Sequence, residues 1–293
     1  MASTLVVIGT GLIGSSLAKA AKERAVYDKV WAVNRSDETN KKVIELGIAH
    51  QTATYNELGE VLGTLTAGDL VVVAIPVRAH KEVFGLIKPM LPEAVVLTDV
   101  GSTKTSIMDA ATEVWGELPP FFVPAHPIAG SEQSGVTAVN PNLFQGRRCI
   151  LTPGEGADLE AIASVQALWE AVGTETDQMA ADHHDEILGA TSHLPHVLAY
   201  AIVDALYTLE QKTEVFRYAA GGFRDFTRIA ESDPVMWRDV FLANRDAILS
   251  QLDNFEAHLV QLRAAIDASD STKIEAILER SQGARKLFSE SKA

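Results

Sequence analysis

Hydrophobic and polar positions follow one another in a regular order along the first half of the chain. Thr4–Ile8 is a continuous, largely β-branched run, as expected for a strand buried on both faces of a parallel sheet. Similar runs recur at Lys29–Val33, Asp69–Ile75, Ala94–Thr98 and Phe121–Val123. Amphipathic stretches with helical spacing separate them. This alternation predicts an α/β fold, a doubly wound parallel sheet of the Rossmann type with helices on both faces.

The helices expected between these strands follow from the spacing of their apolar positions. They cover Ser15–Arg24, Glu38–Leu46, Asn56–Leu62, Ala79–Ile87 and a stretch from Lys104 to about Val114. A polar loop then runs to Gly146. A strand at Arg148–Thr152, a helix at Asp158–Val172 and a short strand near Thr174–Gln178 complete this part of the chain.

From Ala180 the strand patterns stop and the pattern becomes helical to the end of the chain. Helices are expected at Asp182–Leu209, from Gly221, at Pro234–Ala268 and at Ser271–Ser289. The last two are long and amphipathic, so we expect them to bury one stripe against a partner subunit. The pattern predicts a dinucleotide-binding domain over residues 1–178 and an all-α substrate-binding and dimerisation domain over residues 179–293, in a homodimer.

Composition narrows the class of protein. The chain has 293 residues and a formal net charge of −14, which argues against nucleic acid or an anionic membrane as a partner. The single cysteine, Cys149, excludes an intrachain disulfide and fits a reducing compartment. Neither a signal peptide nor an apolar run of about 18 residues is visible. We therefore expect a cytoplasmic protein.

A glycine-rich turn joins the first strand to the first helix. It has the sequence Gly9-Thr10-Gly11-Leu12-Ile13-Gly14, whose glycines permit a tight turn, close approach of a pyrophosphate and close helix–strand packing. The spacing alone is a weak signal, but here the motif follows a strand and opens a helix. It predicts a site for NAD or NADP, to which Ile75, Pro76 and Gly101 at neighbouring strand ends are expected to contribute.

The residues after the second strand bear on the choice of cofactor. Where sites for NAD commonly have an acid that binds the ribose hydroxyls, this chain has Asn34-Arg35-Ser36. Arg35 suits a 2′-phosphate, which no acid repels here, and Ser36 can hydrogen-bond it. Alternatively the three residues form a solvated turn before a helix capped by Asp37. The pattern slightly favours NADP over NAD.

A histidine follows the strand at Phe121–Val123. His126 and Pro127 precede Gly130-Ser131-Glu132, so the strand is expected to deliver an imidazole to its carboxyl end, where ligands of such sheets bind. Histidine suits proton transfer near neutral pH. Ser102 and Lys104 follow another strand end. Ser102 is predicted to take part in the site or to cap a helix, and Lys104 to be either a site residue or an exposed lysine.

The helical half contains a second group of histidines. Pro195 is expected to kink its helix, and His193 and His196, three residues apart, share a face there. A metal site formed by the run from His183 to Glu186 is not expected, because its spacing matches no helix-borne ligand pattern and a polar first turn explains it.

Two arginines lie four residues apart in Ala220–Ala230. Arg224 and Arg228 share a helix face among phenylalanines, and two guanidinium groups in such a setting suit a ligand that carries a carboxylate. Salt bridges to Asp225 and Glu231 are the structural alternative. Trp237 is expected to line the pocket or to pack in the core.

Together these motifs resemble the prephenate/arogenate dehydrogenase family of tyrosine biosynthesis. The resemblance covers nearly the whole chain through residues 9–14, TDVGSTK at 98–104, HPIAGSE at 126–132, TSHLPH at 191–196 and GGFRDFTRIA at 221–230. It implies NAD(P)-dependent oxidative decarboxylation of a cyclohexadienyl substrate. The ring hydroxyl loses its proton, the ring carbon gives a hydride to the nicotinamide, and CO2 leaves.

The resemblance also implies roles for individual residues. His126 matches the proton acceptor, Ser102 a residue that holds the substrate hydroxyl and the histidine, and Arg228 the partner of a substrate carboxylate. The remaining substrate contacts implied are His196, His193, Gly221, Arg224 and Trp237, with Ser131 and Glu132 on a gating loop. No fused chorismate mutase or regulatory ACT domain is expected, so inhibition by tyrosine would act at the active site.

Two alternative functions remain open at the level of the sequence. One is a related dehydrogenase, such as a β-hydroxyacid dehydrogenase or a pyrroline carboxylate reductase. The other is a catalytically silent NAD(P)-binding sensor, although such a protein needs neither His126 nor Arg228. The sequence does not distinguish prephenate from arogenate as the substrate.

Overall fold

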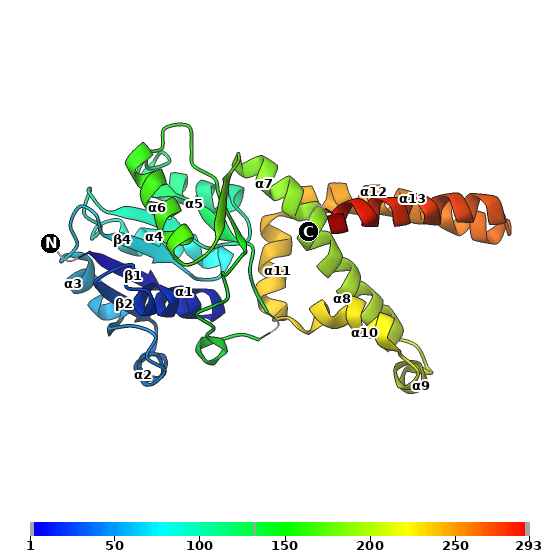
Figure 1. Cartoon of the computed structure of the whole chain (residues 1–293), viewed down its shortest axis with the longest axis horizontal. Helices are drawn as coiled ribbons and strands as arrows, with labels where there is room; N and C mark the ends of the chain where they lie inside the picture. The colour runs from blue at the N-terminus through cyan, green and yellow to red at the C-terminus, as the bar shows by residue number, and fades with distance from the viewer. Residues whose placement is uncertain (1–2, 132, 291–293) are drawn as a thin grey trace. The chain divides into compact units, whose positions relative to one another are not determined.

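The computed structural model describes residues 3–131 and 133–290, and the chain divides into two compact units, Met1–Arg245 and Asp246–Ala293 (Figure 1). The first unit holds all the described strands and the helices up to α11. The second consists of two helices. The domain boundary between residues 178 and 179 stays a prediction.

A six-stranded parallel sheet forms the centre of the first unit. Its strand order is β3-β2-β1-β4-β5-β6, and every neighbouring pair is parallel. The strands are β1 (Thr4–Ile8), β2 (Lys29–Asn34), β3 (Gln51–Thr54), β4 (Leu70–Val73), β5 (Val96–Asp99) and β6 (Phe122–Val123). The predicted doubly wound fold is confirmed.

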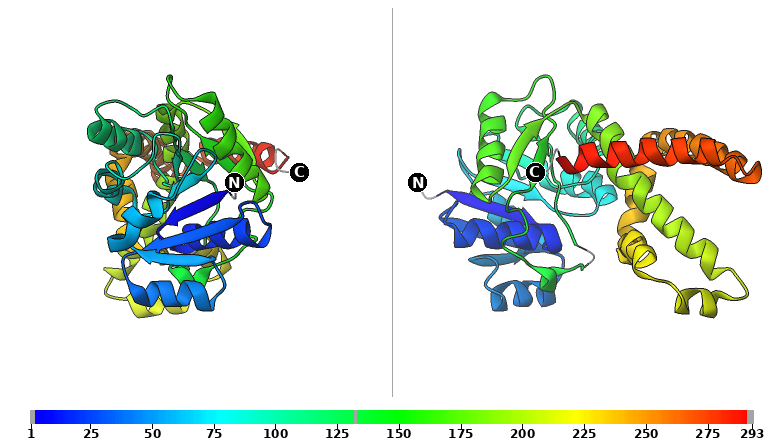
Figure 2. Two further views of the ribbon diagram at one scale, coloured as in Figure 1. Left: turned by 90° about the vertical axis from the view of Figure 1, so that its left-hand side faces the viewer. Right: turned by 45° about the vertical axis from the view of Figure 1, so that its right-hand side comes forward.

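Helices cover both faces of this sheet (Figure 2). On one face Leu5 and Val7 of β1 share a core with α1 (Leu12–Glu23), α2 (Asp37–Glu45) and α6 (Leu159–Ala171). On the other, Val6 and Ile8 pack with α3 (Leu58–Leu62), α4 (His80–Ile87) and α5 (Thr105–Trp115). This alternation along β1 buries both faces of the strand. The single-turn elements are η1 (Tyr55–Glu57), η2 (Val77–Ala79) and η3 (Val136–Ala138).

A second, three-stranded sheet corrects the expected position of His126. Strand β7 (Ala125–Pro127) pairs antiparallel with β8 (Arg148–Leu151), which pairs in parallel with β9 (Glu175–Gln178). Between β6 and β7 stands Pro124, which has no N–H for a ladder hydrogen bond, so the chain leaves one sheet there and enters the other. His126 therefore lies within β7 and not directly at the end of the strand at Phe121–Val123.

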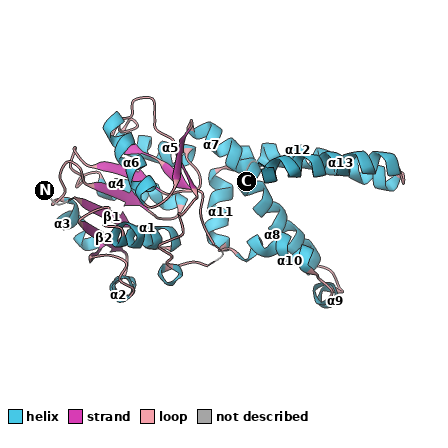
Figure 3. Ribbon diagram, in the orientation of Figure 1, coloured by secondary structure: helices cyan, strands magenta, loops and turns pink. Residues whose placement is uncertain are grey.

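The chain after β9 is helical (Figure 3). Helix α7 (Ala181–Leu188) passes into a π-helical turn, η4 (Gly189–His193), and then into α8 (Leu194–Tyr207), with Pro195 in its first turn. The interruption thus lies where the proline removes a helical hydrogen bond. The remaining elements of the first unit are α9 (Lys212–Arg217), α10 (Gly221–Thr227), η5 (Arg228–Glu231) and α11 (Pro234–Ala243).

The single long helix expected at Pro234–Ala268 is wrong. Asn244 ends α11, and a new helix, α12 (Arg245–Asp267), begins after it. The Asn244 amide donates to the carbonyl of Asp185, so the buried side chain is held by α7. Helix α13 (Ser271–Glu290) lies beside α12 within the second unit (Figure 1). Among the helices of the described residues, none is long and apolar enough to span a membrane.

Candidate active site

The glycine-rich turn between β1 and α1 admits no side chain at two positions. A Cβ on Gly14 would lie 2.0 Å from the Gly9 carbonyl oxygen, and one on Gly9 would lie 2.4 Å from the Ala74 carbonyl oxygen. Gly9 also has a φ of +93°, which L side chains rarely adopt. These contacts hold the start of α1 against β1 and β4.

The same turn fits a dinucleotide. No side chain caps the first turn of α1, whose N-cap is Gly11, and nothing lies within 4 Å of a Cβ built on Gly11. The N–H groups at this helix end are therefore open to a phosphate, which the helix dipole favours. The predicted cofactor residues Leu12, Ile13 and Gly14 belong to this first turn.

Asn34 at the end of β2 is buried, and both the oxygen and the nitrogen of its amide form hydrogen bonds. Its Oδ1 accepts hydrogen bonds from the main-chain N–H of Thr10 at 3.0 Å and from the Thr10 hydroxyl at 2.8 Å, and its Nδ2 donates to Asn40 Oδ1 at 3.0 Å. Asn34 thus ties the glycine-rich turn to α2. Arg35 and Ser36 are exposed, and Ser36 accepts a capping hydrogen bond from the N–H of Thr39.

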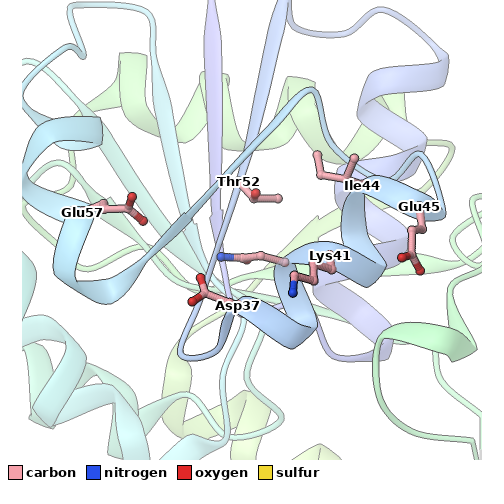
Figure 4. A pocket seen from close by; sticks show the side chains of 7 residues that line it. Asp37, Lys41, Ile44, Glu45, Thr52 and Glu57 are labelled. Carbon is pink, nitrogen blue, oxygen red and sulfur yellow. The ribbon is translucent and has the colours of Figure 1, made fainter.

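Two hollows open near the cofactor residues. One of about 550 Å³ lies between α2 and β3, and its lining, which includes Asp37, Lys41 and Thr52, contains none of the predicted site residues (Figure 4). The other, of about 370 Å³, is lined by Leu12 of α1 together with Ser131, Gln133 and residues 137–140. The second hollow therefore brings a predicted cofactor residue and a predicted gating residue together.

His126 makes a directed contact with the helical part of the unit. Its Nδ1 lies 2.9 Å from Nε2 of His184 on α7, and His184 Nδ1 lies 2.8 Å from Asp185 Oδ1. Burial, aided by the neighbouring His184, Lys104 and His193, holds the pKa of His126 well below its usual value. His126 is therefore neutral at pH 7 and can accept a proton.

Asp185 remains ionised despite its burial. Burial raises the pKa of its carboxyl group, but hydrogen bonds from His184 and from the N–H groups of Lys104 and Thr105 lower it by more. The two N–H groups, at the start of α5, lie 2.8 and 2.9 Å from the carboxylate oxygens. Asp185 thus joins α7 to the loop that contains Ser102.

Lys104 is fully buried, so its alternative assignment as an exposed lysine is wrong. Its Nζ donates to Asp99 Oδ2 at 2.6 Å and to the Ala125 carbonyl at 2.7 Å. Burial lowers the pKa of Lys104, and the Asp99 carboxylate opposes that shift. The lysine therefore links the end of β5 to β7, next to His126.

His193 and His196 both contact Trp237 of α11. The ring of His196 stacks on Trp237 with centroids 3.5 Å apart, and His193 meets it edge-on at 6.0 Å. His193 accepts a hydrogen bond from Asn244. Burial lowers the pKa of His193 to about 4. These two imidazoles and the indole form one cluster, and Trp237 is itself buried.

The predicted substrate arginines lie elsewhere on the helical part. Arg224 is on α10 and Arg228 begins η5, both exposed, and these two elements pack against α8. Gly221 opens α10, as expected from the paired glycines. Glu132 lies outside the described residues.

The structure brings together His126, Lys104 and His193, and adds two residues that the sequence reasoning missed. His184 and Asp185 were assigned to a polar first turn, yet both are buried. The only signal in the sequence is that two adjacent ionisable residues precede a predicted kink. Among the described residues, no cluster of three or more His, Cys, Asp or Glu side chains could hold a metal ion.

Comparisons with known proteins place this geometry in context. Residues 17–177 match the family model described as prephenate dehydrogenase, nucleotide-binding domain, and residues 180–280 match prephenate dehydrogenase, dimerization domain. The cyclohexadienyl dehydrogenase of Zymomonas mobilis is 37% identical over 284 residues, which is 96% of this chain and 94% of that protein.

Two solved structures are similar along nearly the whole chain. The prephenate dehydrogenase of A. aeolicus in complex with hydroxyphenyl propionate and NAD+ has a TM-score of 0.90 at 32% identity, covering 98% of this chain and 99% of that one. The Synechocystis arogenate dehydrogenase has a TM-score of 0.80 at 26% identity, covering 97% and 99%.

Proposed function

This chain belongs to the prephenate dehydrogenase family, and we propose that it catalyses the NAD(P)-dependent oxidative decarboxylation of prephenate, arogenate or both. The products are 4-hydroxyphenylpyruvate and tyrosine respectively, so the reaction belongs to tyrosine biosynthesis. The names of the relatives support this substrate class, since they include a cyclohexadienyl, a prephenate and an arogenate dehydrogenase.

The observation that carries the proposal is the imidazole of His126, half-buried on β7 with its Nδ1 held 2.9 Å from His184. An acceptor of this kind draws the proton from the C4 hydroxyl of the ring as the hydride leaves C4. When the carboxylate leaves as CO2 and the ring becomes aromatic, the proton returns to the oxygen. NAD(P)+, when bound, supplies the hydride acceptor, and the glycine-rich turn holds its phosphates.

The test is the absorbance of reduced nicotinamide in four mixtures of purified protein, with prephenate or arogenate and with NAD+ or NADP+. A clear rate in any mixture supports the reaction, and the pattern of rates identifies substrate and cofactor together. If no reduced nicotinamide forms in any of the four mixtures although a titration shows that the cofactor binds, the proposal is contradicted and an NAD(P)-binding sensor is favoured.

Arg228 is proposed to pair with a substrate carboxylate. Its replacement by alanine should raise the KM for the substrate by a factor that corresponds to about 2–4 kcal/mol of a charge-assisted pair, with a smaller effect on kcat. Steady-state kinetics of Arg228→Ala and Arg217→Ala provide the measurement. Arg217 is an exposed arginine at the end of α9 and serves as the control. Equal KM values for the two variants would remove Arg228 from the site.

We propose NADP as the preferred cofactor, with Arg35 and Ser36 as ligands of the 2′-phosphate. The exposed Arg35 lies 3.9 Å from the Glu82 carboxylate and over the Tyr55 ring, 5.8 Å from its centre. Asn34, bonded internally, brings no negative charge. Arg35→Ala should weaken NADP+ binding by about 10–100-fold, the loss of one charge-assisted hydrogen bond, and leave NAD+ binding nearly unchanged. Fluorescence titration with both cofactors measures this. Equal losses for both would contradict the assignment.

Assembly and regulation complete the proposal. The match to a dimerization domain over residues 180–280 supports a homodimer. Inhibition by tyrosine, where it occurs, is proposed to be competitive at the active site. The cytoplasmic location stays a prediction from the sequence.

A further inference from the structure

Three side chains form a hydrogen-bonded line that ends at His126. Asp185 Oδ1, His184 and His126 are joined by contacts of 2.8 and 2.9 Å. The two imidazoles meet edge-on, with centroids 5.1 Å apart and planes inclined at 64°. His184 is completely buried, so no solvent competes for either of its nitrogens.

In each hydrogen bond of this line the donor and the acceptor are fixed, and this follows from the carboxylate of Asp185. An ionised carboxylate only accepts hydrogen bonds, and Asp185 already accepts two from the N–H groups of Lys104 and Thr105. His184 Nδ1 must therefore be the donor to Asp185. In a neutral ring the other nitrogen, Nε2, is then an acceptor, so Nδ1 of His126 must donate to it.

We propose that His184 and Asp185 are positioning residues that fix the tautomer of His126, with the proton on Nδ1 and the lone pair on Nε2. The proposed function requires this lone pair as the proton acceptor. The inference rests on the proposed function only for that requirement. Without the line, His126 can place its proton on either nitrogen, and only one of the two neutral forms accepts from a substrate.

The same line stabilises His126 after it takes up a proton. The imidazolium donates from Nδ1 to His184, and the Asp185 carboxylate at the far end of the line opposes the new positive charge. The other groups that face His126 are Lys104 and His193. Lys104 is neutralised by Asp99 at 2.6 Å, so Asp185 is the carboxylate left to balance a charge on His126. This is the role of the aspartate in a Ser-His-Asp triad, with one imidazole inserted.

Imidazole 15N shifts of histidine-labelled protein test the tautomer without any need for turnover. In the wild type the His126 signal, assigned by its loss in His126→Asn, should show a protonated Nδ1 and an unprotonated Nε2. In His184→Leu the Nδ1 proton of His126 has no acceptor, so the ring should populate both neutral tautomers and its two nitrogen shifts should move towards each other. In His184→Gln, whose amide oxygen can accept from Nδ1, the wild-type pattern should return. A wild-type His126 protonated on Nε2, or an unchanged tautomer in His184→Leu, would overturn the inference.

Kinetics of variants separate positioning from packing. Asp185→Asn removes the negative charge that stabilises the His126 imidazolium and should lower kcat by about 10²–10⁴-fold, the range known for the aspartate of a triad, with KM nearly unchanged. His184→Leu should lower kcat by about 10–100-fold. His184→Gln, whose amide oxygen can still accept from His126, should recover most of that loss. Equal kcat values for His184→Leu and His184→Gln would show that position 184 needs only a side chain of sufficient size, and would contradict the proposal.

Two controls keep the outcomes distinct. His183→Gln changes the exposed neighbour of His184 and should leave kcat unchanged. Thermal unfolding of each variant shows whether a lost rate reflects lost folding, since Asp185 also caps α5. If the wild type turns over no substrate, the proposed function fails while the 15N shifts still decide the tautomer. If the wild type is active and Asp185→Asn retains its rate, this inference alone fails.

Discussion

Replacing His126 by asparagine is expected to lower kcat by about 10²–10⁴-fold, the usual contribution of a general base, and to leave cofactor binding unchanged. The asparagine amide can occupy the place of Nδ1 and keep the contact with His184, while the nitrogen at the Nε2 position is lost. Steady-state kinetics and a cofactor titration measure the two effects. Turnover that survives the substitution would show that His126 is not the proton acceptor.

The pH dependence of the wild type gives the same assignment a second check. Because burial lowers the pKa of His126, the ring stays neutral, and kcat should stay constant, as the pH falls through the usual histidine value of about 6.5. The rate should fall only when the pH passes the lowered pKa and the imidazolium forms. The residual rate of His126→Asn should lack this acid limb. A limb at the usual histidine value or above it would contradict the lowered pKa.

Replacing Lys104 by methionine is expected to lower the free energy of unfolding by about 3–5 kcal/mol, the cost of removing one partner from a buried ion pair. Both Lys104 and Asp99 are completely buried. The variant leaves the Asp99 carboxylate without its cation and the Ala125 carbonyl without a donor. Urea unfolding followed by circular dichroism measures the change.

A matched control exists at the surface. Lys81 pairs with Glu113, and both side chains are more than half exposed, so Lys81→Met should cost less than about 1 kcal/mol. The double variant Lys104→Met with Asp99→Asn should regain part of the loss, because it removes the uncompensated charge. Similar stabilities for Lys104→Met and Lys81→Met would contradict the structural role of Lys104.

The sheet could be predicted largely because its strands are continuous apolar runs. Strand β3 was not predicted, because Gln51–Thr54 is mostly polar. An edge strand with a single neighbour can have such a sequence. Strand β7 was not predicted as a separate strand, because it has three residues, one of them a proline. In both cases pairing with a neighbour, and not the local apolar pattern, makes the strand.

The candidate site could be predicted only in part, for a related reason. His126 was identified by its place after a strand. Its partner His184 lies 58 residues further along the chain, and Asp185 lies 81 residues from Lys104. Helical spacing tells which residues share a face, but not which element will pack against that face. Asp185 was therefore assigned to a polar first turn, and Lys104 was left as either a site residue or an exposed lysine. Each is in fact buried, Lys104 against the Asp99 carboxylate and Asp185 against main-chain N–H groups.

The amide pair between Asn34 and Asn40 has a consequence for how cofactor preference can change over evolutionary time. Asn34 uses its oxygen towards Thr10 and its nitrogen towards Asn40. An aspartate at this position keeps the contact with Thr10, and Asn40 needs only to rotate its amide by half a turn to donate instead of accept. Asparagine and aspartate codons differ by one base. A descendant of this protein can thus gain the ribose-binding acid in one mutational step without loosening the glycine-rich turn.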